Sequence, residues 1–224
     1  MRGIWVGWLA AVVAWGGVIV APASLSTGTA CATSGPGGDS EIFGPNACQI
    51  DVPEAGLTVS AEARIQGWGL HVQTNGGGSS LTDPATYGYA SGEADITYQV
   101  TITGGQGQGW AQVVVQPHMN LDGPSLWWNA WAWVNGEGQE AFVDIEMIWE
   151  VPFTYGVPFD VRMLAAAQGS GNDSGDGGFA DIRMTLASVE VQGLGGAQVP
   201  EPGAAWLVAA GGSALVLRRR ARRL

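Results

Sequence analysis

Few residues in this chain are suited to acid–base or nucleophilic chemistry. There are two histidines, no lysine and no Gly-x-Ser-x-Gly segment, so a nucleophile with a histidine base and a histidine-centred metal site both lack the residues they need. Asp144, Glu146 and Glu150 lie at even spacing in an alternating segment, which predicts one strand face with neighbours about 6.8 Å apart. That separation resembles an inverting glycosidase pair, but such carboxylates flank the sugar from opposite sides. We interpret the three as a solvated face.

A polar loop at residues 171–178 places oxygen donors on a glycine-rich backbone, and Asp181 follows it. Calcium takes roughly six to eight such oxygens. The loop matches neither the EF-hand spacing nor the Gly-rich nonapeptide repeat, and a polar turn without metal has the same composition. No cofactor is expected other than calcium, whose candidate ligands are Asn172, Asp173, Asp176 and Asp181.

Tryptophans form the sharpest functional pattern. Alternation along residues 126–134 assigns one face to Trp127, Asn129, Trp131 and Trp133. The other face is apolar and small, as a core face should be, which would turn the tryptophans outward, where aromatic rings and an amide can hold sugar rings. The alternative is that the tryptophans fill the interior and the alanine face is covered too. Composition favours this alternative, because large aromatic side chains dominate cores.

These residues belong to a chain whose main pattern is alternation with a period of two. No segment has the apolar stripe of a helix, and glycine-rich turns separate the alternating runs. Strands are predicted over residues 57–65, 68–72, 93–103, 110–116, 125–134, 141–151, 157–165 and 180–191. Asn135-Gly136 predicts a hairpin turn, and residues 33–53 an irregular arm. The expected fold is all-β, an antiparallel β-sandwich of the jelly-roll type.

The N-terminus has the organisation of a signal peptide. Met1-Arg2 precedes an apolar stretch, Ile4–Val20, and Ala-x-Ala cleavage sites end at Ala23 and Ala32. We expect a signal peptide over residues 1–32, with the earlier cut after Ala23 as the alternative. The chain is therefore expected to be exported.

The position of the cut decides the state of the two cysteines. After a cut at Ala23, Cys31 and Cys48 both remain and can form one disulfide in an oxidising compartment. After a cut at Ala32, Cys48 is a lone thiol. The sequence leaves both outcomes open.

Charge is distributed unevenly along the chain. Residues 33–199 contain three arginines and nineteen acids, a net charge of −16, whereas the whole chain carries −11. Such a surface repels nucleic acid and anionic lipid and attracts divalent cations or basic partners. Nucleic acid is therefore excluded as a partner.

The last twenty-six residues combine a short motif, an apolar stretch and a basic end. Pro200-Glu201-Pro202 is followed by fifteen uncharged residues, Gly203–Leu217. The apolar run before a basic end predicts a transmembrane helix. The helix would be short, because fifteen residues reach about 22 Å, less than the ~30 Å core of a bilayer. The basic stop, which prefers the cytoplasmic side, consists of Arg218, Arg219, Arg220, Arg222 and Arg223.

In this order, the three parts resemble the PEP-CTERM sorting signal of Gram-negative bacteria. Residues 151–159 and the strands after them also look like the last strands of the β-sandwich ectodomain common in PEP-CTERM proteins. The resemblance implies that an exosortase recognises Pro200-Glu201-Pro202, that the apolar anchor is removed, and that the protein acts in the extracellular polysaccharide or biofilm matrix. The expected domains are a signal peptide (1–32), an ectodomain (33–198) and a sorting signal (199–224).

We therefore expect a non-enzymatic protein of the cell surface or extracellular matrix. Before processing it would be attached to the inner membrane by its C-terminal segment, and its role would be structural or adhesive. The alternative is a carbohydrate-binding module that uses the tryptophan face and follows the same sorting route.

Overall fold

The computed structural model describes residues 17–34, 40–52, 57–78, 87–124, 126–172 and 177–192. Within these ranges the chain forms twelve strands joined by turns. The strands are β1 (Val18–Ser34), β2 (Ser40–Gly44), β3 (Ala47–Val52), β4 (Leu57–Gln66), β5 (Gly69–Gly78), β6 (Tyr87–Ile102), β7 (Gln108–Asp122), β8 (Leu126–Val134), β9 (Glu137–Glu140), β10 (Met147–Thr154), β11 (Phe159–Asn172) and β12 (Phe179–Val191). Among the described residues there is no helix long and apolar enough to cross a bilayer.

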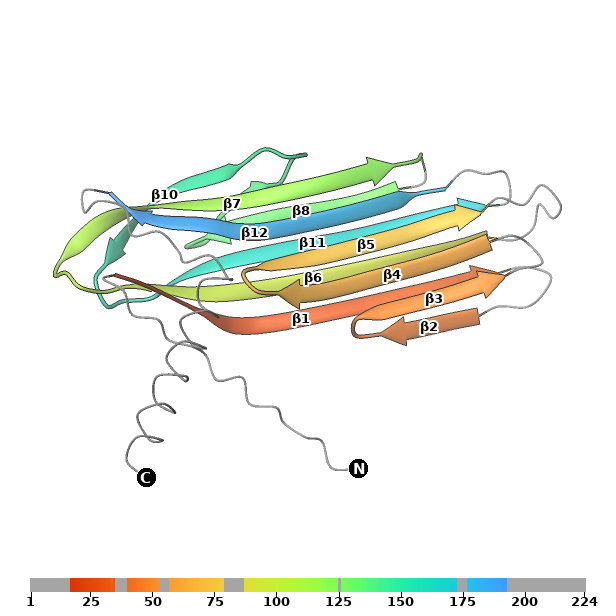
Figure 1. Ribbon diagram of the computed structural model, residues 1–224, viewed down its shortest axis with the longest axis horizontal. Helices are drawn as coiled ribbons and strands as arrows, with labels where there is room; N and C mark the ends of the chain where they lie inside the picture. Colours follow the sequence, from red (N-terminus) through yellow and green to blue (C-terminus); the bar gives the residue numbers. More distant parts are fainter. Residues whose placement is uncertain are drawn as a thin grey trace, which may run out of the picture.

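The strands form two six-stranded antiparallel sheets, here called sheet A and sheet B. The strand order is β2-β1-β6-β11-β8-β9 in sheet A and β10-β7-β12-β5-β4-β3 in sheet B. In Figure 1, β4 and β5 of sheet B run in front of β6 and β11 of sheet A, with the strands of both sheets nearly aligned. The predicted all-β fold is confirmed as two antiparallel sheets, in agreement with a sandwich. The jelly-roll type stays a prediction.

The core lies between the sheets, because each long strand alternates buried and exposed side chains. In β6 every second residue from Gly88 to Ile102 is buried, and β4 and β12 alternate in the same way. Ile96 and Met163 of sheet A and Val72 and Ile182 of sheet B are almost fully buried. Burying an aliphatic side chain of this size contributes about 1.5–3 kcal/mol. The two sheets are therefore held together by packing of the apolar side chains whose alternation is visible in the sequence.

Side-chain contacts close both open sides of the sandwich. On one side a disulfide joins Cys31 of β1 to Cys48 of β3, and hence sheet A to sheet B. On the other side the Trp149 indole N–H donates to the Glu137 carbonyl at 3.1 Å. The Gln139 side-chain amide donates to the Ile148 carbonyl at 3.2 Å. This second bond occupies a carbonyl of the edge strand β10, which would otherwise be open to pairing.

Three predictions about where strands lie are wrong. Residues 33–53 were predicted to be an irregular arm, but β2 and β3 lie in this segment. The strand predicted to end before Pro117 continues as β7 to Asp122. Pairing between β7 and β10 stops at Val115, so Pro117 lies where β7 has β12 alone beside it among the described residues, and a proline is tolerated there. The strand predicted over 141–151 is only β10, because residues 141–146 form turns.

The predicted hairpin at Asn135-Gly136 is confirmed. Both residues have positive φ, 51° and 87°, and Val134 pairs with Glu137 across the two-residue turn. Positive φ at both positions is what a type I′ turn requires.

Both predicted targeting segments lie wholly or partly outside the described residues. These are residues 1–16 and the whole tail from 193, including the Pro200-Glu201-Pro202 motif, the predicted helix and the arginines. The domain boundary predicted after Ala32 falls inside β1, which pairs with β6 from Val18 to Ser34. The position of the cut stays a prediction.

Candidate functional site

The predicted tryptophan face lies on the outer surface of sheet A. Residues Ala130, Ala132 and Val134 of β8 are fully buried, so the alternate residues of the strand point away from the core. These are Trp127, Asn129, Trp131 and Trp133, the set predicted to share one face. The interpretation that the three tryptophans fill the interior is wrong, because no strand of the described chain covers this face of sheet A.

Two of the tryptophans pack on each other and do not form a flat platform with the third. The rings of Trp131 and Trp133 are stacked, with centroids 5.8 Å apart and planes at 18°. The guanidinium of Arg162 lies 5.0 Å from the Trp133 ring centroid. Arg162 also donates from Nε to Asp95 at 3.0 Å, and this hydrogen bond raises the arginine pKa. Each stacked indole thus covers one face of the other. Less of the surface of these two tryptophans is therefore open to stacking by a ligand.

Trp127 differs because its side chain is 56% exposed and borders a hollow. The hollow has a volume of about 440 Å³ and opens on the outer surface of sheet A. Its floor comes from β1, β6 and β11, where small side chains leave the space unfilled: Gly28, Ala30, Ser91 and Ala166. A Cβ added at Gly28 would meet no atom within 4 Å. Trp127 therefore forms an aromatic wall beside an open floor.

Polar side chains stand beside this floor. Glu93 lies between Gly28 and Ala166 in the strand register, so its neighbours across the strands have almost no side chain. Asn129 pairs with Ala166, and Gln168 pairs with Trp127. A carboxylate and two amides supply both acceptors and donors. With the indole of Trp127, they form a surface suited to a ligand with apolar ring faces and many hydroxyl groups.

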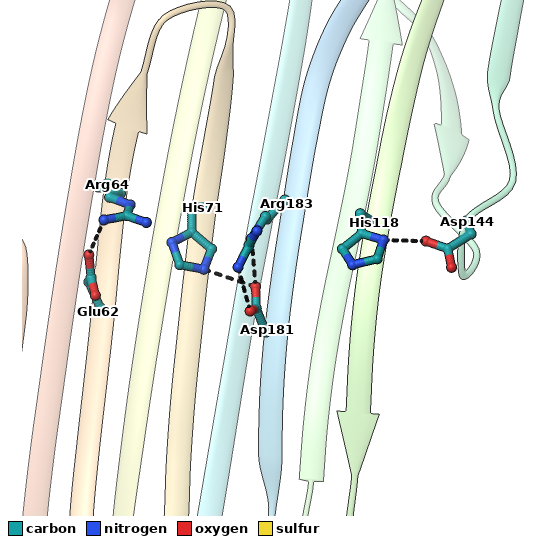
Figure 2. A network of polar contacts seen from close by, with 7 residues as sticks. All are labelled: Glu62, Arg64, His71, His118, Asp144, Asp181 and Arg183. Carbon is teal, nitrogen blue, oxygen red and sulfur yellow. Dashed lines mark hydrogen bonds and ion pairs between the residues drawn. The ribbon is translucent and has the colours of Figure 1, made fainter.

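The outer face of sheet B carries a row of basic residues, shown in Figure 2. Arg64, His71, Arg183 and His118 are consecutive register partners on β4, β5, β12 and β7. Four of the five basic side chains that the structure describes thus lie in one line. The fifth is Arg162, on the opposite face.

Each member of this row has a carboxylate partner. Arg64 pairs with Glu62 at 2.9 Å, and His118 Nδ1 lies 2.8 Å from Asp144. Asp181 is the partner of both His71 and Arg183.

Asp181 accepts from Arg183 at 2.8 Å through one oxygen, while His71 Nε2 lies 2.9 Å from the other. His71 is 7% exposed, and its Nδ1 is buried without a partner among the described residues. The row is self-compensated, and we interpret it as a stabilising network of sheet B.

The candidate calcium ligands are not brought together by the described residues. Both oxygens of Asp181 already accept from Arg183, and one of them also lies 2.9 Å from His71 Nε2. Asp173, Asp176 and the side chain of Asn172 lie outside the described residues. Across the described ranges there is no group of three metal-ligating side chains. Calcium in this loop stays a prediction.

The three carboxylates predicted on one strand face are separated. Asp144 lies in a turn with φ of 53° and bonds to His118. Glu146 precedes β10, and Glu150, on β10, accepts from the Gln192 side chain at 3.1 Å. The expected strand face does not exist, because the chain turns at residues 141–146.

Sequence reasoning missed the hollow and the residues that line it, Glu93 among them. The alternation of β6 placed Glu93 on the outer face, but only strand pairing shows that Gly28 and Ala166 flank it. No protein-family model, curated protein or solved structure matches the chain.

Proposed function

We propose that the protein is an exported, non-enzymatic component of the cell surface or extracellular matrix that binds polysaccharide through the outer face of sheet A. The observation that carries this proposal is the exposed Trp127 indole beside a hollow lined by small residues. The polar side chains of Glu93, Asn129 and Gln168 lie on the same face beside it. Sugar rings have apolar faces that stack on indoles and hydroxyls that bond to carboxylates and amides. This combines the adhesive role expected from the tail with the alternative of a carbohydrate-binding module.

For the C-terminal route we propose processing by an exosortase at Pro200-Glu201-Pro202. The sequence of motif, apolar stretch and arginines supports it. The last strand, β12, ends at Val191, so the motif follows the strands of the sandwich, and a cut near it leaves every described strand intact. The product would be a strongly acidic domain free of its membrane segment.

At the N-terminus we propose the earlier cut, after Ala23. Residues from Ser24 onward pair with β6 in one register, which shifts between Pro22 and Ser24. A cut after Ala32 would remove most of β1 and the disulfide partner of Cys48. A cut after Ala23 retains the disulfide and the β1 residues of the hollow.

Two exposed tryptophans allow a matched test of glycan binding. Trp127 on sheet A is 56% exposed, and Trp110 on sheet B is 53% exposed. We expect the Trp127→Ala variant to lose at least tenfold in affinity for a polysaccharide that the native protein binds, about 1.4 kcal/mol. Trp110→Ala should bind as the native protein does. Isothermal titration against a panel of soluble polysaccharides measures both.

The proposal fails if the native protein binds none of the panel, or if the two variants lose affinity equally.

A further inference from the structure

We propose that the hollow is the middle of a trough that runs across the strands from Trp127 on β8 to Phe43 on β2, and that it binds a linear polysaccharide of uncharged or amine-bearing sugars. The inference rests on the proposed function. It adds a second aromatic contact, a polar contact and the class of sugar.

A single register row defines the trough. Phe43 pairs with Ala30, Ala30 with Ser91, Ser91 with Gln168, and Gln168 with Trp127. Residues paired directly across strands point to the same face, so both aromatic side chains stand on the outer face of sheet A. Four strand spacings of ~4.8 Å separate them, about 19 Å in all.

The two aromatic residues are the exposed ends of this row. Phe43 is 71% exposed and Trp127 is 56% exposed. Between them, Ala30 and Ser91 are small, and Gln168 alone has a longer side chain. An extended chain can therefore lie across the strands with a ring stacked at each end, while a compact ligand would reach one end only.

Glu93 supplies the polar contact at the floor. Its carboxylate forms no hydrogen bond or ion pair within the part of the chain that the structure describes, although the positive charge of Arg162 acts on it from the same face. A carboxylate can accept from two hydroxyls or pair with an amine. Because Gly28 and Ala166 flank it, a ligand can approach it directly.

The charge of this face decides the class of sugar. Glu41, Glu93, Asp95 and Asp160 lie on the outer face of sheet A by their register. The one cation that the described residues place there is Arg162, which is bonded to Asp95. The remaining described arginines and both histidines lie on sheet B. Uronate or sulfated chains would therefore be repelled, whereas neutral chains are tolerated and amine-bearing chains are attracted.

The test uses the mature exported protein, titrated with three soluble polymers: a neutral β-glucan, chitosan oligosaccharides and alginate. Native protein should bind the glucan or the chitosan and not alginate. Phe43→Ala should weaken binding about tenfold, and Trp110→Ala, which removes an indole that is 53% exposed on sheet B, should not. Gly28→Leu should block the floor with no clash of its Cβ. Glu93→Gln should weaken chitosan more than glucan.

The outcomes separate this inference from the proposed function. If Trp127→Ala abolishes binding while Phe43→Ala and Gly28→Leu bind as native, polysaccharide binding stands and the trough is wrong. Preferential binding of alginate overturns the class of sugar. If the native protein binds none of the three polymers, the trough is wrong, and the wider polysaccharide panel decides whether the proposed function fails as well.

Discussion

Tryptophans that look equivalent in the sequence have different surroundings in the fold. β9 pairs with β8 only from Trp131 to Val134, so Trp127 lies where β8 has β11 alone beside it among the described residues. Trp133 leans over Gly138 of β9, whose added Cβ would meet the indole at 2.5 Å. The short β9 therefore decides which tryptophan is free to bind.

The sequence predicts which side chains share a face of β8 but not which face is outside. The period of two groups Trp127 with Trp131 and Trp133, and the structure confirms this grouping. Both faces of β8 are apolar, however, so hydrophobicity does not separate them. The side facing the core is fixed by contact with β7 and β12 across the sandwich, which the alternation within β8 does not reveal.

At the residue scale, the ion pairs of sheet B differ in burial, and their removal should differ in cost. Asp181→Ala leaves His71, which is 7% exposed, and Arg183 without their acceptor. We expect a loss of about 1–3 kcal/mol in the free energy of unfolding, because a buried polar group is left unpaired. Glu62→Ala breaks a pair whose side chains are 49% and 40% exposed and should cost about 1 kcal/mol or less.

Urea unfolding followed by circular dichroism measures both values. Equal losses in the two variants would contradict the interpretation that burial makes the Asp181 pairs important.

At the element scale, the two sheets approach closely enough near one end that only glycine fits. A Cβ on Gly76 of β5 would meet the backbone of Gly169 on β11 at 2.5 Å, and Gly76 N–H donates to the Gly178 carbonyl at 2.9 Å. Long alternating strands such as β4, β6 and β12 were predicted from the sequence. This close approach of the sheets was not predicted, because its glycines come from β5, from β11 and from the residues just before β12.

Gly76→Ala should therefore destabilise the sandwich by about 1–3 kcal/mol through backbone displacement. Gly28→Ala is the control, since its Cβ meets nothing within 4 Å, and it should change stability by about 0.5 kcal/mol or less. Thermal unfolding of the two variants provides the comparison. A Gly76→Ala protein as stable as the control would show that the sheets can separate there without cost.

At the scale of the whole molecule, the two outer faces differ in the placement of their basic side chains and in expected role. Sheet B carries the row of four basic residues, each beside a carboxylate, whereas sheet A carries Arg162 and the exposed Trp127. The count of charged residues predicted an acidic surface but not this placement, because the row of basic residues comes from four strands spread between residues 64 and 183. One face is thus assigned to stability and the other to binding.

Processing at both ends gives a prediction for the whole chain. The mature protein should begin at Ser24 and contain no free thiol, because Cys31 and Cys48 are bonded. Replacing Pro200, Glu201 and Pro202 by alanine should leave a longer product retained in the membrane. Intact mass spectrometry of the exported protein, with and without alkylation, measures both ends. A mature N-terminus at Thr33, or unchanged processing of the alanine variant, would contradict the proposed route.

The central claim is that the outer face of sheet A binds polysaccharide beside Trp127. It is tested most directly by nuclear magnetic resonance of the ¹⁵N-labelled protein during titration with the polysaccharide that binds best. We predict that the Trp127 indole signal and the amides of Gly28, Ser91 and Glu93 shift, while the Trp110 indole on sheet B does not. Shifts confined to sheet B, or no shift at saturating polysaccharide, would contradict the account.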